Sequence, residues 1–590
     1  MPERVRWLLV FVYLSMLVLA GRLVQLQVLE HGKYATLARG NHQRTETIPA
    51  LRGRIFDRKG NTLADNRIAV DLYYSGGPVL FARQILDILG LKELPPVKKG
   101  EEVVLAANLP DEWVPTLAEL SAGQSNLRLE ERIERYYPNP IAGPVIGYVQ
   151  GPTAADLKRG YERGDLVGRA GLEAALEDTL RGRRGLKLVE VNVHGEVVRE
   201  QVLAPPQPGK DVYLTIDLSL QRAAEKALAE GLADLNAGRD KLHEPHEQVA
   251  KGAMVALDPK SGEVLAMATA PAYDPNLFTR RPAPAGEIAA LQKDPAHPLL
   301  NRAVQAYTPG STFKPVTASA LLEKRLVTPA TTYRCLPAIT FGGQVRRNWS
   351  ARDMGPMTVK EALAYSCNTW FYQAVIKAGP TSSIDVIAAR ARELGFGSRT
   401  GLELAEKAGL VPDKAWKKER FGQPWYPGET LSVAIGQGAV LATPVQLAKM
   451  LATVATGGLA ARPHLVLKVD GQPTRVRAHQ VKGRYWRVLQ EGLRKTVTEG
   501  TSSFRLKNFP VPTAGKTGTA ETPGKKAGYE HAWYIGYGPY PLEGKSPYPP
   551  LVAVAFFENA GEGSRVALPA VKKLMQAYWK VPAELPPEKR

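Results

Sequence analysis

The chain has 590 residues, more than one hydrophobic core usually supports, so two or three domains are expected. Its 44% hydrophobic and 23% charged residues are typical of a globular protein and argue against a disordered one. A formal net charge of +19 predicts an anionic partner: nucleic acid, an acidic membrane surface or an anionic cell-wall polymer. The basic residues are scattered and no zinc-finger spacing is present, which argues against nucleic acid.

The N-terminus carries an uncharged stretch at residues 7–21, preceded by Arg4 and Arg6 and followed by Arg22. An apolar helical pattern continues to Leu29, and arginines at both ends can reach the two membrane interfaces. These features predict a transmembrane anchor at residues 7–29.

The competing interpretation of this stretch is a cleaved signal peptide, with residues 18–20 resembling a processing site. The retained anchor is favoured because the apolar pattern runs past this point without a break. The positive-inside rule then predicts a cytoplasmic tail at residues 1–6, with everything after the anchor outside the cytoplasm.

A region without any recognisable active-site constellation is expected at residues 30–209. It begins with a strand, turn and strand over residues 51–60, with the turn at 57–60, and continues with short strands and helices. By spacing alone, the arginines and lysines of residues 51–60 are best explained as a solvated hairpin. The Pro-rich residues 205–209 predict a linker.

A second domain is expected over residues 210–581, followed by a flexible tail at 582–590. It opens with a strand at 211–216, after which Asp217 caps a helix with an apolar face formed by Leu228, Leu232 and Leu235. A helix is also expected at 569–579. The pattern is α+β, with five antiparallel strands from both ends of the domain around a helical insert; the strands are expected at residues 253–257, 264–268, 511–519, 532–537 and 551–557.

The first chemical motif lies at residues 311–314, where Ser311 and Lys314 are three positions apart. A Pro-Gly pair ends a loop before it, and a helix is expected over 312–324, with Pro315 tolerated in its first turn. Ser311 then stands at a helix N-terminus, which favours negative charge. A second cation and shielding from water would lower the pKa of Lys314 enough for it to act as the serine's base. Alone, this spacing is better explained as an ordinary helix-capping serine followed by a surface lysine.

The second motif is the tripeptide at residues 366–368. Ser366 could relay a proton between Lys314 and a leaving amine, and Asn368 could bind a substrate's peptide amide. The two cysteines, Cys335 and Cys367, form neither a disulfide framework nor a metal site. A bridge between them is left open, and no metal or cofactor is expected.

The third motif, residues 516–519, lies on a predicted strand. Lys516 supplies positive charge, while Thr517 and Thr519 offer hydroxyls to a terminal carboxylate. Gly518 omits a side chain where a substrate backbone would lie beside the strand. Together the three motifs provide an activated serine, a proton shuttle and a carboxylate-binding lysine, which is typical of a penicillin-recognising acyl transferase.

Over nearly its whole length the chain resembles the class B penicillin-binding proteins, and within them elongation-type penicillin-binding protein 2. Besides the three motifs, the resemblance rests on residues 52–58, 168–173, 301–302, 309–315, 425–430, 434–438, 443–444 and 531–536. The elongation branch is favoured by residues 425–430 and 531–536. Some relatives carry aspartate at the position of Asn368, which leaves the substrate's charge preference open.

The resemblance implies a peptidoglycan D,D-transpeptidase with the penicillin-binding, serine-transpeptidase fold: a five-stranded antiparallel sheet with helices on both faces, after a mixed α/β pedestal. In that mechanism Ser311 forms an acyl-enzyme with a peptidoglycan stem pentapeptide, and β-lactams acylate the same serine. The backbone N–H groups of Ser311 and Thr519 would form the oxyanion hole.

The resemblance also implies partners. Nascent glycan strands, a SEDS-type (RodA-like) glycan polymerase bound through anchor and pedestal, other elongation-complex proteins and the cell membrane are expected. A polymerase interface then becomes as good an explanation of the hairpin at residues 51–60 as solvation. No second active site for glycan polymerisation is visible, which predicts a monofunctional enzyme.

The alternatives that share this site are a division-type transpeptidase, a D,D-carboxypeptidase and a β-lactamase. No clear glutamate motif for a deacylating base is found, which argues against the β-lactamase. A β-lactam sensor would need a cytoplasmic output segment, and about six residues before the anchor leave no room for one.

Overall fold

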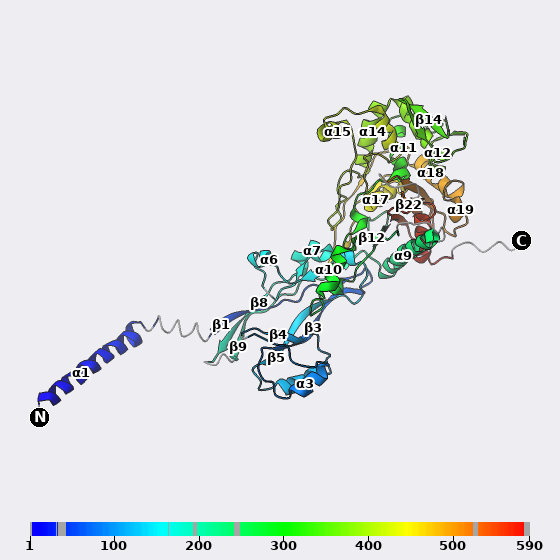
Figure 1. The fold of residues 1–590 in the computed structure, drawn as a ribbon. Coiled ribbons are helices and arrows are strands. Elements are labelled where there is room, and N and C mark those ends of the chain that lie inside the picture. Colours follow the sequence, from blue (N-terminus) through cyan, green and yellow to red (C-terminus); the bar gives the residue numbers. More distant parts are fainter. Residues whose placement is uncertain are drawn as a thin grey trace. The chain divides into compact units, whose positions relative to one another are not determined.

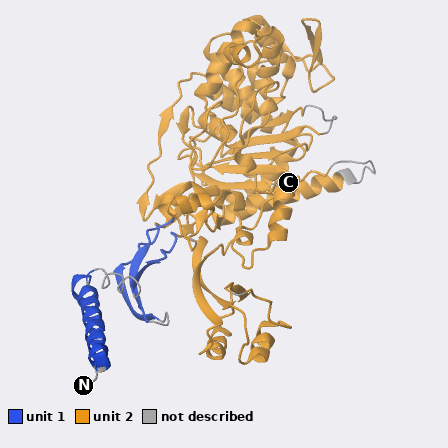
Figure 2. Ribbon diagram, turned by 60° about the vertical axis from the view of Figure 1, so that its left-hand side comes forward, with its two compact units in different colours: residues 1–53, 181–209 blue, residues 54–180, 210–590 orange. Residues whose placement is uncertain are grey.

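The structure, a computed structural model, describes residues 3–30, 32, 43–98, 100–162, 164–192, 197–240, 248–522 and 529–582. The predicted tail at 582–590 lies outside these residues except for its first position. The chain divides into two compact units, a first unit of residues 1–53 and 181–209 and a second unit of residues 54–180 and 210–590 (Figure 2). The units therefore cut across the predicted region of residues 30–209.

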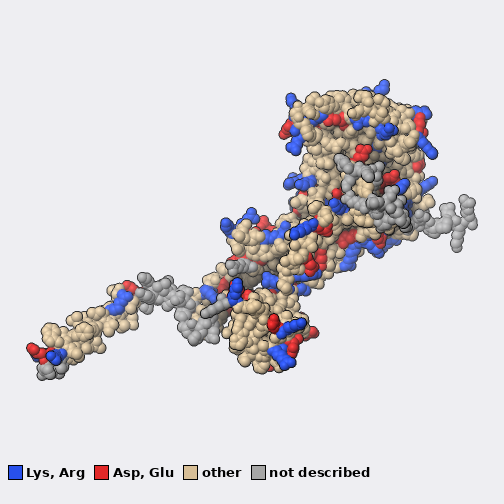
Figure 3. Space-filling view, viewed as in Figure 1, with Lys and Arg blue, Asp and Glu red and all other residues tan. Residues whose placement is uncertain are grey.

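The first unit contains the predicted anchor. Helix α1 (Glu3–Val24) is followed by a π-helical turn, η1 (Gln25–Leu29). The segment Arg6–Leu29 is long and apolar enough to cross a membrane, and none of it is buried by the rest of the chain. Its visible surface is uncharged between the two ends of the helix, as a membrane-spanning helix requires (Figure 3).

The first unit also contains a three-stranded antiparallel sheet of order β1-β8-β9. Its strands are β1 (Gln43–Ile48), β8 (Gly185–Val191) and β9 (Val197–Ala204). All but the last residue of β9 are exposed, including the apolar Val198 and Leu203. This sheet therefore has little core of its own.

The N-terminal part of the second unit is a mixture of strands and short helices, as expected. Strand β3 is its longest element and pairs with β2, β4 and β5. The elements are β2 (Ile55–Phe56), β3 (Thr62–Tyr74), α3 (Ala82–Leu89), β4 (Val103–Ala106), α4 (Val114–Ser121), β5 (Leu127–Tyr136), α5 (Gly143–Ile146), β6 (Val149–Gln150), α6 (Ala154–Lys158), β7 (Val167–Gly168), α7 (Gly171–Ala175) and α8 (Glu177–Leu180).

Strand β10 (Val212–Leu214) joins this part to the C-terminal part of the unit, because it pairs in parallel with β2 and antiparallel with β18 (Val466–Val469). With β19 (Gln472–Pro473) at one edge, the resulting seven-stranded sheet has the order β19-β18-β10-β2-β3-β4, with β5 paired to β3. Segments more than 150 residues apart in the sequence thus share one sheet. The predicted strand at 211–216, observed as β10, extends a sheet whose first strands lie before residue 140.

The predicted hairpin after residue 51 is confirmed, but its charges are not simply solvated. Asp57 is fully buried, and its carboxylate accepts hydrogen bonds from the backbone N–H groups of Lys59 and Leu218, which closes the turn and binds it to the next helix. Three cations of the hairpin form ion pairs with acids beyond residue 210: Arg54 with Asp211, Arg58 with Glu263 and Lys59 with Asp217. Arg54 and Lys59 are still more than half exposed, so the solvated interpretation describes these side chains only in part: they face solvent but are paired with acids of the next domain.

The predicted five-stranded antiparallel sheet is confirmed, in the order β12-β11-β23-β22-β21. Its strands are β11 (Gly252–Leu257), β12 (Val264–Ala270), β21 (Ala514–Ala520), β22 (His531–Gly538) and β23 (Leu551–Phe557). Every residue of β11 and β23 is buried, because both faces of the sheet are covered. Strand β21, which carries the third motif, is an edge strand with one unpaired side.

Two layers of helices cover this sheet. On one face lie α9 (Leu218–Asp240), capped by Asp217 as predicted, and α20 (Ala567–Trp579). On the other face, α17 (Pro444–Ala455) packs against β11, β22 and β23, and α18 (Trp486–Thr498) packs against β21. Figure 1 shows α17 beside β22. The expected arrangement of helices on both faces is confirmed.

The helical insert lies between β12 and β21. Its remaining helices are η2 (Pro275–Phe278), α10 (Ala285–Lys293), η3 (Arg302–Val304), η4 (Gly310–Phe313), α11 (Lys314–Glu323), α12 (Val359–Ala364), α13 (Asn368–Ala378), α14 (Pro380–Glu393), α15 (Lys414–Phe421), α16 (Pro427–Ala434) and α19 (Ser503–Leu506). Its remaining strands are β13 (Tyr333–Arg334), β14 (Ala338–Phe341), β15 (Gln344–Arg347), β16 (Pro356–Met357), β17 (Leu459–Ala461), β19 (Gln472–Pro473) and β20 (Ala478–Gln480).

Candidate active site

Ser311 lies in the 3₁₀ turn η4, which leads directly into α11. The helical turn thus begins at Gly310, two residues earlier than predicted, and Pro315 falls in the first turn of α11 as expected. Gly310 has φ +56°, and a Cβ there would lie 2.6 Å from the carbonyl oxygen of Thr519. Only glycine fits this position, and its close approach brings the serine turn against the strand of the third motif.

Lys314 is completely buried one turn after Ser311. Its Nζ donates hydrogen bonds to the backbone oxygen of Ser366 at 2.7 Å, to the Ser366 hydroxyl at 3.2 Å and to Oδ1 of Asn368 at 2.7 Å. Burial, and secondarily the positive charge of Lys516, hold the pKa of Lys314 well below its ordinary value of 10.5. The structure therefore joins the first two motifs through one lysine.

The loop of the second motif connects α12 to α13 and holds Ser366 in an unusual conformation. Ser366 has φ +56°, in the left-handed region that serine seldom adopts. This conformation turns both its carbonyl and its hydroxyl toward Lys314. The free-energy cost of such a backbone conformation is typical of residues in functional sites.

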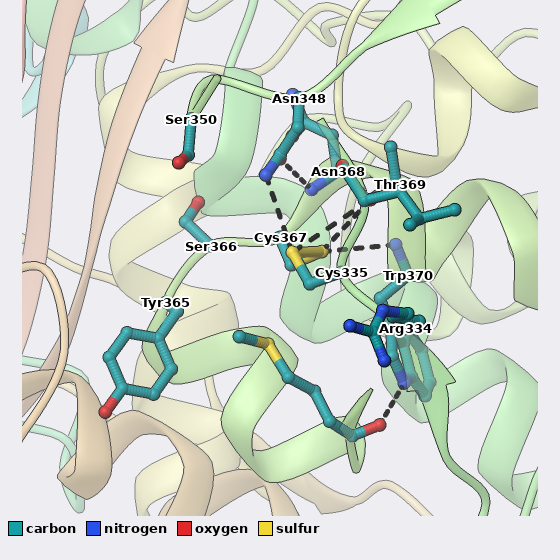
Figure 4. The surroundings of a disulfide bond; sticks show 12 residues. Arg334, Cys335, Asn348, Ser350, Tyr365, Ser366, Cys367, Asn368, Thr369 and Trp370 are labelled. Carbon is teal, nitrogen blue, oxygen red and sulfur yellow. Dashed lines mark hydrogen bonds between the residues drawn. A yellow bond between two sulfur atoms is a disulfide. The ribbon is translucent and has the colours of Figure 1, made fainter. Parts of the chain in front are cut away.

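A disulfide between Cys335 and Cys367, which the sequence left open, closes around this loop. Cys367 lies between Ser366 and Asn368 and caps α13, since its sulfur accepts from the Trp370 N–H. Figure 4 shows the disulfide next to Ser366 and Asn368.

Asn348 also supports this loop, although sequence reasoning did not identify it. Its Oδ1 accepts from the Asn368 N–H at 2.9 Å, and its Nδ2 approaches the Cys335 sulfur at 3.4 Å (Figure 4). The second motif is thus fixed by a covalent bond and by a side chain that is distant in sequence, neither of which has a local signal.

Lys516, on β21, is also completely buried. Its Nζ donates to the backbone oxygen of Thr517 at 3.0 Å, and burial lowers its pKa from 10.5 to about 7. The positive charge of Lys516 contributes, after burial, to lowering the pKa of Lys314. The second cation that the sequence required beside Lys314 is therefore supplied by the third motif.

Gly518 has a steric role that the sequence did not predict. A Cβ at this position would lie 2.7 Å from Cγ2 of Thr312 and 3.0 Å from Cβ of Trp533. It would therefore meet the serine turn and the neighbouring strand β22. Glycine here allows close packing of β21 against η4, while its predicted place beside a substrate backbone stays a prediction.

The two threonines of the third motif have partners outside the predicted set. Thr517 Oγ1 lies 2.7 Å from Oγ1 of Thr501, and Thr519 Oγ1 accepts from the Gly563 N–H at 3.5 Å. Thr501 was missed because it lies in a short turn and belongs to none of the three motifs. Within the described parts of the chain, no group of three His, Cys, Asp or Glu residues is arranged to hold a metal ion.

Known protein families match both the N-terminal and the C-terminal part of the chain. The profile of the penicillin-binding protein transpeptidase domain matches residues 252–576, and that of the penicillin-binding protein dimerisation domain matches residues 47–214. Peptidoglycan D,D-transpeptidase MrdA of Haemophilus influenzae is 32% identical over 623 aligned residues, covering 96% of this chain and 90% of the relative.

Solved structures of penicillin-binding proteins are also similar to this chain. One, described as the structural coordination of polymerization and crosslinking by a peptidoglycan synthase complex, contains a chain 62% identical to this one, with a TM-score of 0.84 and 99% of each chain covered. Penicillin-binding protein PBP2 in complex with MreC from Helicobacter pylori is 26% identical, with a TM-score of 0.73, covering 90% of this chain and 99% of that chain. Because the motifs meet in one site and the similarity spans nearly the whole length, the chain belongs to the penicillin-binding protein transpeptidase family, in the elongation-type branch of PBP2 and MrdA.

Proposed function

We propose that the chain is a monofunctional peptidoglycan D,D-transpeptidase that cross-links stem peptides during cell elongation through an acyl-enzyme on Ser311. The observation that carries the proposal is the buried Lys314, one turn after Ser311 and hydrogen-bonded to Ser366 and Asn368. The lowered pKa of Lys314 favours its neutral form, which can accept the proton of a serine hydroxyl.

In this mechanism Ser311 attacks the carbonyl of the penultimate D-alanine of a stem pentapeptide. Lys314 takes the hydroxyl proton, and Ser366, which contacts Lys314, delivers it to the departing D-alanine. An amine of a neighbouring stem peptide then attacks the acyl-enzyme and closes the cross-link. β-Lactams acylate the same serine.

The third motif binds the substrate. Lys516, Thr517 and Thr519 hold the terminal carboxylate, and Asn368 binds a peptide amide. The backbone N–H groups of Ser311 and Thr519 stabilise the oxyanion. The tight packing of Gly310 and Gly518, which holds the serine turn against β21, supports this role for β21.

Residues 30–209 serve as a pedestal and residues 210–581 as the transpeptidase domain, between an anchor and a short tail. The anchor holds the chain in the cytoplasmic membrane as a single-pass protein, with the N-terminus inside and the catalytic domain outside. The disulfide supports this location, because such bonds persist mainly outside the cytoplasm. The proposed partners are a SEDS-type polymerase and other elongation proteins. The related synthase complex, which coordinates polymerization and crosslinking, supports a polymerising partner, and the PBP2–MreC complex supports a partner similar to MreC.

The proposal is tested by intact mass spectrometry of the full chain in detergent after benzylpenicillin is added. An adduct that lasts many minutes, is absent in Ser311→Ala and is retained in the control Ser382→Ala, an exposed serine of α14, supports the proposal. A rapidly lost adduct would indicate hydrolysis and a β-lactamase. If folded protein forms no adduct, the assignment of Ser311 is wrong.

Amine transfer separates a transpeptidase from a carboxypeptidase. With a stem-peptide thioester or pentapeptide donor, a D-amino acid acceptor should appear in the product at the expense of the hydrolysed peptide. Hydrolysis alone, at saturating acceptor, would assign the chain to the carboxypeptidases.

A further inference from the structure

Thr501 lies in the turn between α18 and α19, and it contacts both the third motif and the end of α12, which leads into the second motif. Its backbone N–H donates to the carbonyl of Ala364, two residues before Ser366, at 3.1 Å. Its hydroxyl lies 2.7 Å from the hydroxyl of Thr517 on β21. Thr501 is thus the point at which this turn connects the proton-shuttle loop to the carboxylate-binding strand.

The turn itself is held firmly. A Cβ on Gly500 would lie 2.1 Å from the Ala364 oxygen, so the backbone of the turn packs directly on the end of α12. The Thr496 backbone oxygen accepts from the Ser502 N–H at 3.0 Å. These contacts fix the backbone of the turn at a place from which the Thr501 hydroxyl reaches Thr517.

The chemistry of the pair depends on its protons. Each hydroxyl has one proton to donate, and one of the two is used in the bond between the threonines. To hold a carboxylate, Thr517 must donate its own proton to the anion, since an anion accepts hydrogen bonds. Thr517 can do this only if Thr501 is the donor within the pair.

We propose that Thr501 is a positioning residue for carboxylate recognition: it donates its hydroxyl proton to Thr517 and so leaves the Thr517 proton directed at the substrate's terminal carboxylate. This inference rests on the proposed function, in which Thr517 binds that carboxylate. Thr517 is 6% exposed while Thr501 is only partly buried, so the pair lies at the border between core and solvent, where a substrate can reach it.

The test compares acylation of the full chain by benzylpenicillin and by its methyl ester, which lacks the negative charge. In Thr501→Val, which keeps the shape but removes the hydroxyl, the second-order acylation rate for the acid should fall about five- to tenfold, while the rate for the ester stays unchanged. Thr501→Ser should keep the wild-type ratio. Thr498→Val, whose hydroxyl bonds only weakly to the preceding turn of α18, is the matched control.

A second comparison tests the route through Thr517. Thr517→Val should reduce the acid-to-ester ratio at least as much as Thr501→Val, and the double variant should be no worse than Thr517→Val alone. Additive losses would show that Thr501 acts independently of Thr517 and would overturn the proposal.

Other outcomes are equally decisive. If Thr501→Val lowers the acylation rates of the acid and the ester equally, Thr501 acts in folding or in the chemical step. If it lowers neither rate, the contact with Thr517 has no effect on carboxylate recognition. Either result overturns the proposal. If valine at 501 lowers the thermal midpoint, Thr501→Ala carries the same comparison. Failure of the wild-type chain to form any adduct would instead refute the proposed function itself.

Discussion

Two sheets of the same chain differ in how they are stabilised. The five-stranded sheet of the second unit is covered on both faces, and all residues of β11 and β23 are buried. In the three-stranded sheet of the first unit, Val197, Val198, Val202 and Leu203 of β9 are each more than half exposed. The five-stranded sheet is a rigid support in its own right, whereas the three-stranded sheet leaves apolar surface for another molecule to cover.

The better-covered sheet is the one that carries the candidate active site. The five-stranded sheet carries β21, against which the serine turn packs through Gly310 and Gly518. Burying Lys314 and Lys516 costs free energy because both amines lose contact with water. The well-packed domain around them can offset this cost. Substitutions in each region test whether the two sheets differ as much in energetics as they do in burial.

The largest effect is expected for Lys314. Lys314→Met keeps the length and removes the base, and it should lower the rate of penicillin acylation by a factor of about 10²–10⁴. The protein should remain folded, because a buried amine is replaced by an apolar chain of similar length. Acylation is followed by intact mass and folding by circular dichroism. A variant that acylates at the wild-type rate would exclude Lys314 as the base.

Trp533→Ala should destabilise the five-stranded sheet by about 3–5 kcal/mol. Trp533 is fully buried on β22, donates to the Thr308 oxygen at 3.0 Å and packs against Phe556. The thermal or denaturant midpoint measures the loss, with Phe504→Ala, a 63% exposed aromatic, as control. Equal midpoints for the two variants would contradict the importance of this core.

Loss of the disulfide should have a comparable or slightly smaller effect. The bond closes 32 residues of chain, so Cys335→Ala/Cys367→Ala should cost about 3–4 kcal/mol if the entropy of the unfolded loop dominates. Acylation should fall as well, because Cys367 adjoins Ser366. Treatment with dithiothreitol should reproduce both changes, and an unaltered midpoint after complete reduction would refute this expectation.

Lys516 should make stability depend on pH. Burial lowers its folded-state pKa from 10.5 to about 7, so the unfolded chain binds more protons between these values and stability rises with pH there. The contribution is at most about 1.4 kcal/mol per pH unit. In Lys516→Met the denaturant midpoint should rise less steeply from pH 7 to pH 9. The same slope in both proteins would mean that Lys516 keeps its ordinary pKa.

The smallest effect is expected on β9. Val198→Thr, at a position 67% exposed, should change stability by less than about 0.5 kcal/mol and leave acylation unchanged. The same midpoint measurement as for Trp533→Ala checks it. A loss of several kcal/mol in the isolated chain would show that β9 is covered by the chain itself.

Much of the fold could be predicted because its signals are local. The apolar segment before Leu29, the strand at β11 with its returning partner β12, and the Asp217 cap each follow from neighbouring residues. The helix after Ser311 was also predicted, but a 3₁₀ turn that begins at Gly310 precedes it and α11 itself begins at Lys314. The close approach of Gly310 to Thr519, which this turn requires, has no local signal.

The sequence revealed the chemical character of the three motifs, but it did not reveal the distant residues that hold the catalytic domain and the motifs in place. The Thr501–Thr517 contact, the role of Asn348 and the ion pairs of the hairpin with Asp211, Glu263 and Asp217 join residues that are distant in sequence. No periodicity or spacing within a segment reports such contacts.

The sequence by itself therefore determined the kind of chemistry, the anchor and the strands of the catalytic sheet, because residue type and short-range pattern are sufficient for each. Only the tertiary structure decided that Lys516 is the cation beside Lys314, that Gly518 makes room for Thr312 and that the two cysteines pair. The physical reason is that pKa, steric fit and covalent pairing depend on which distant atoms come within a few ångströms, and folding alone brings them there.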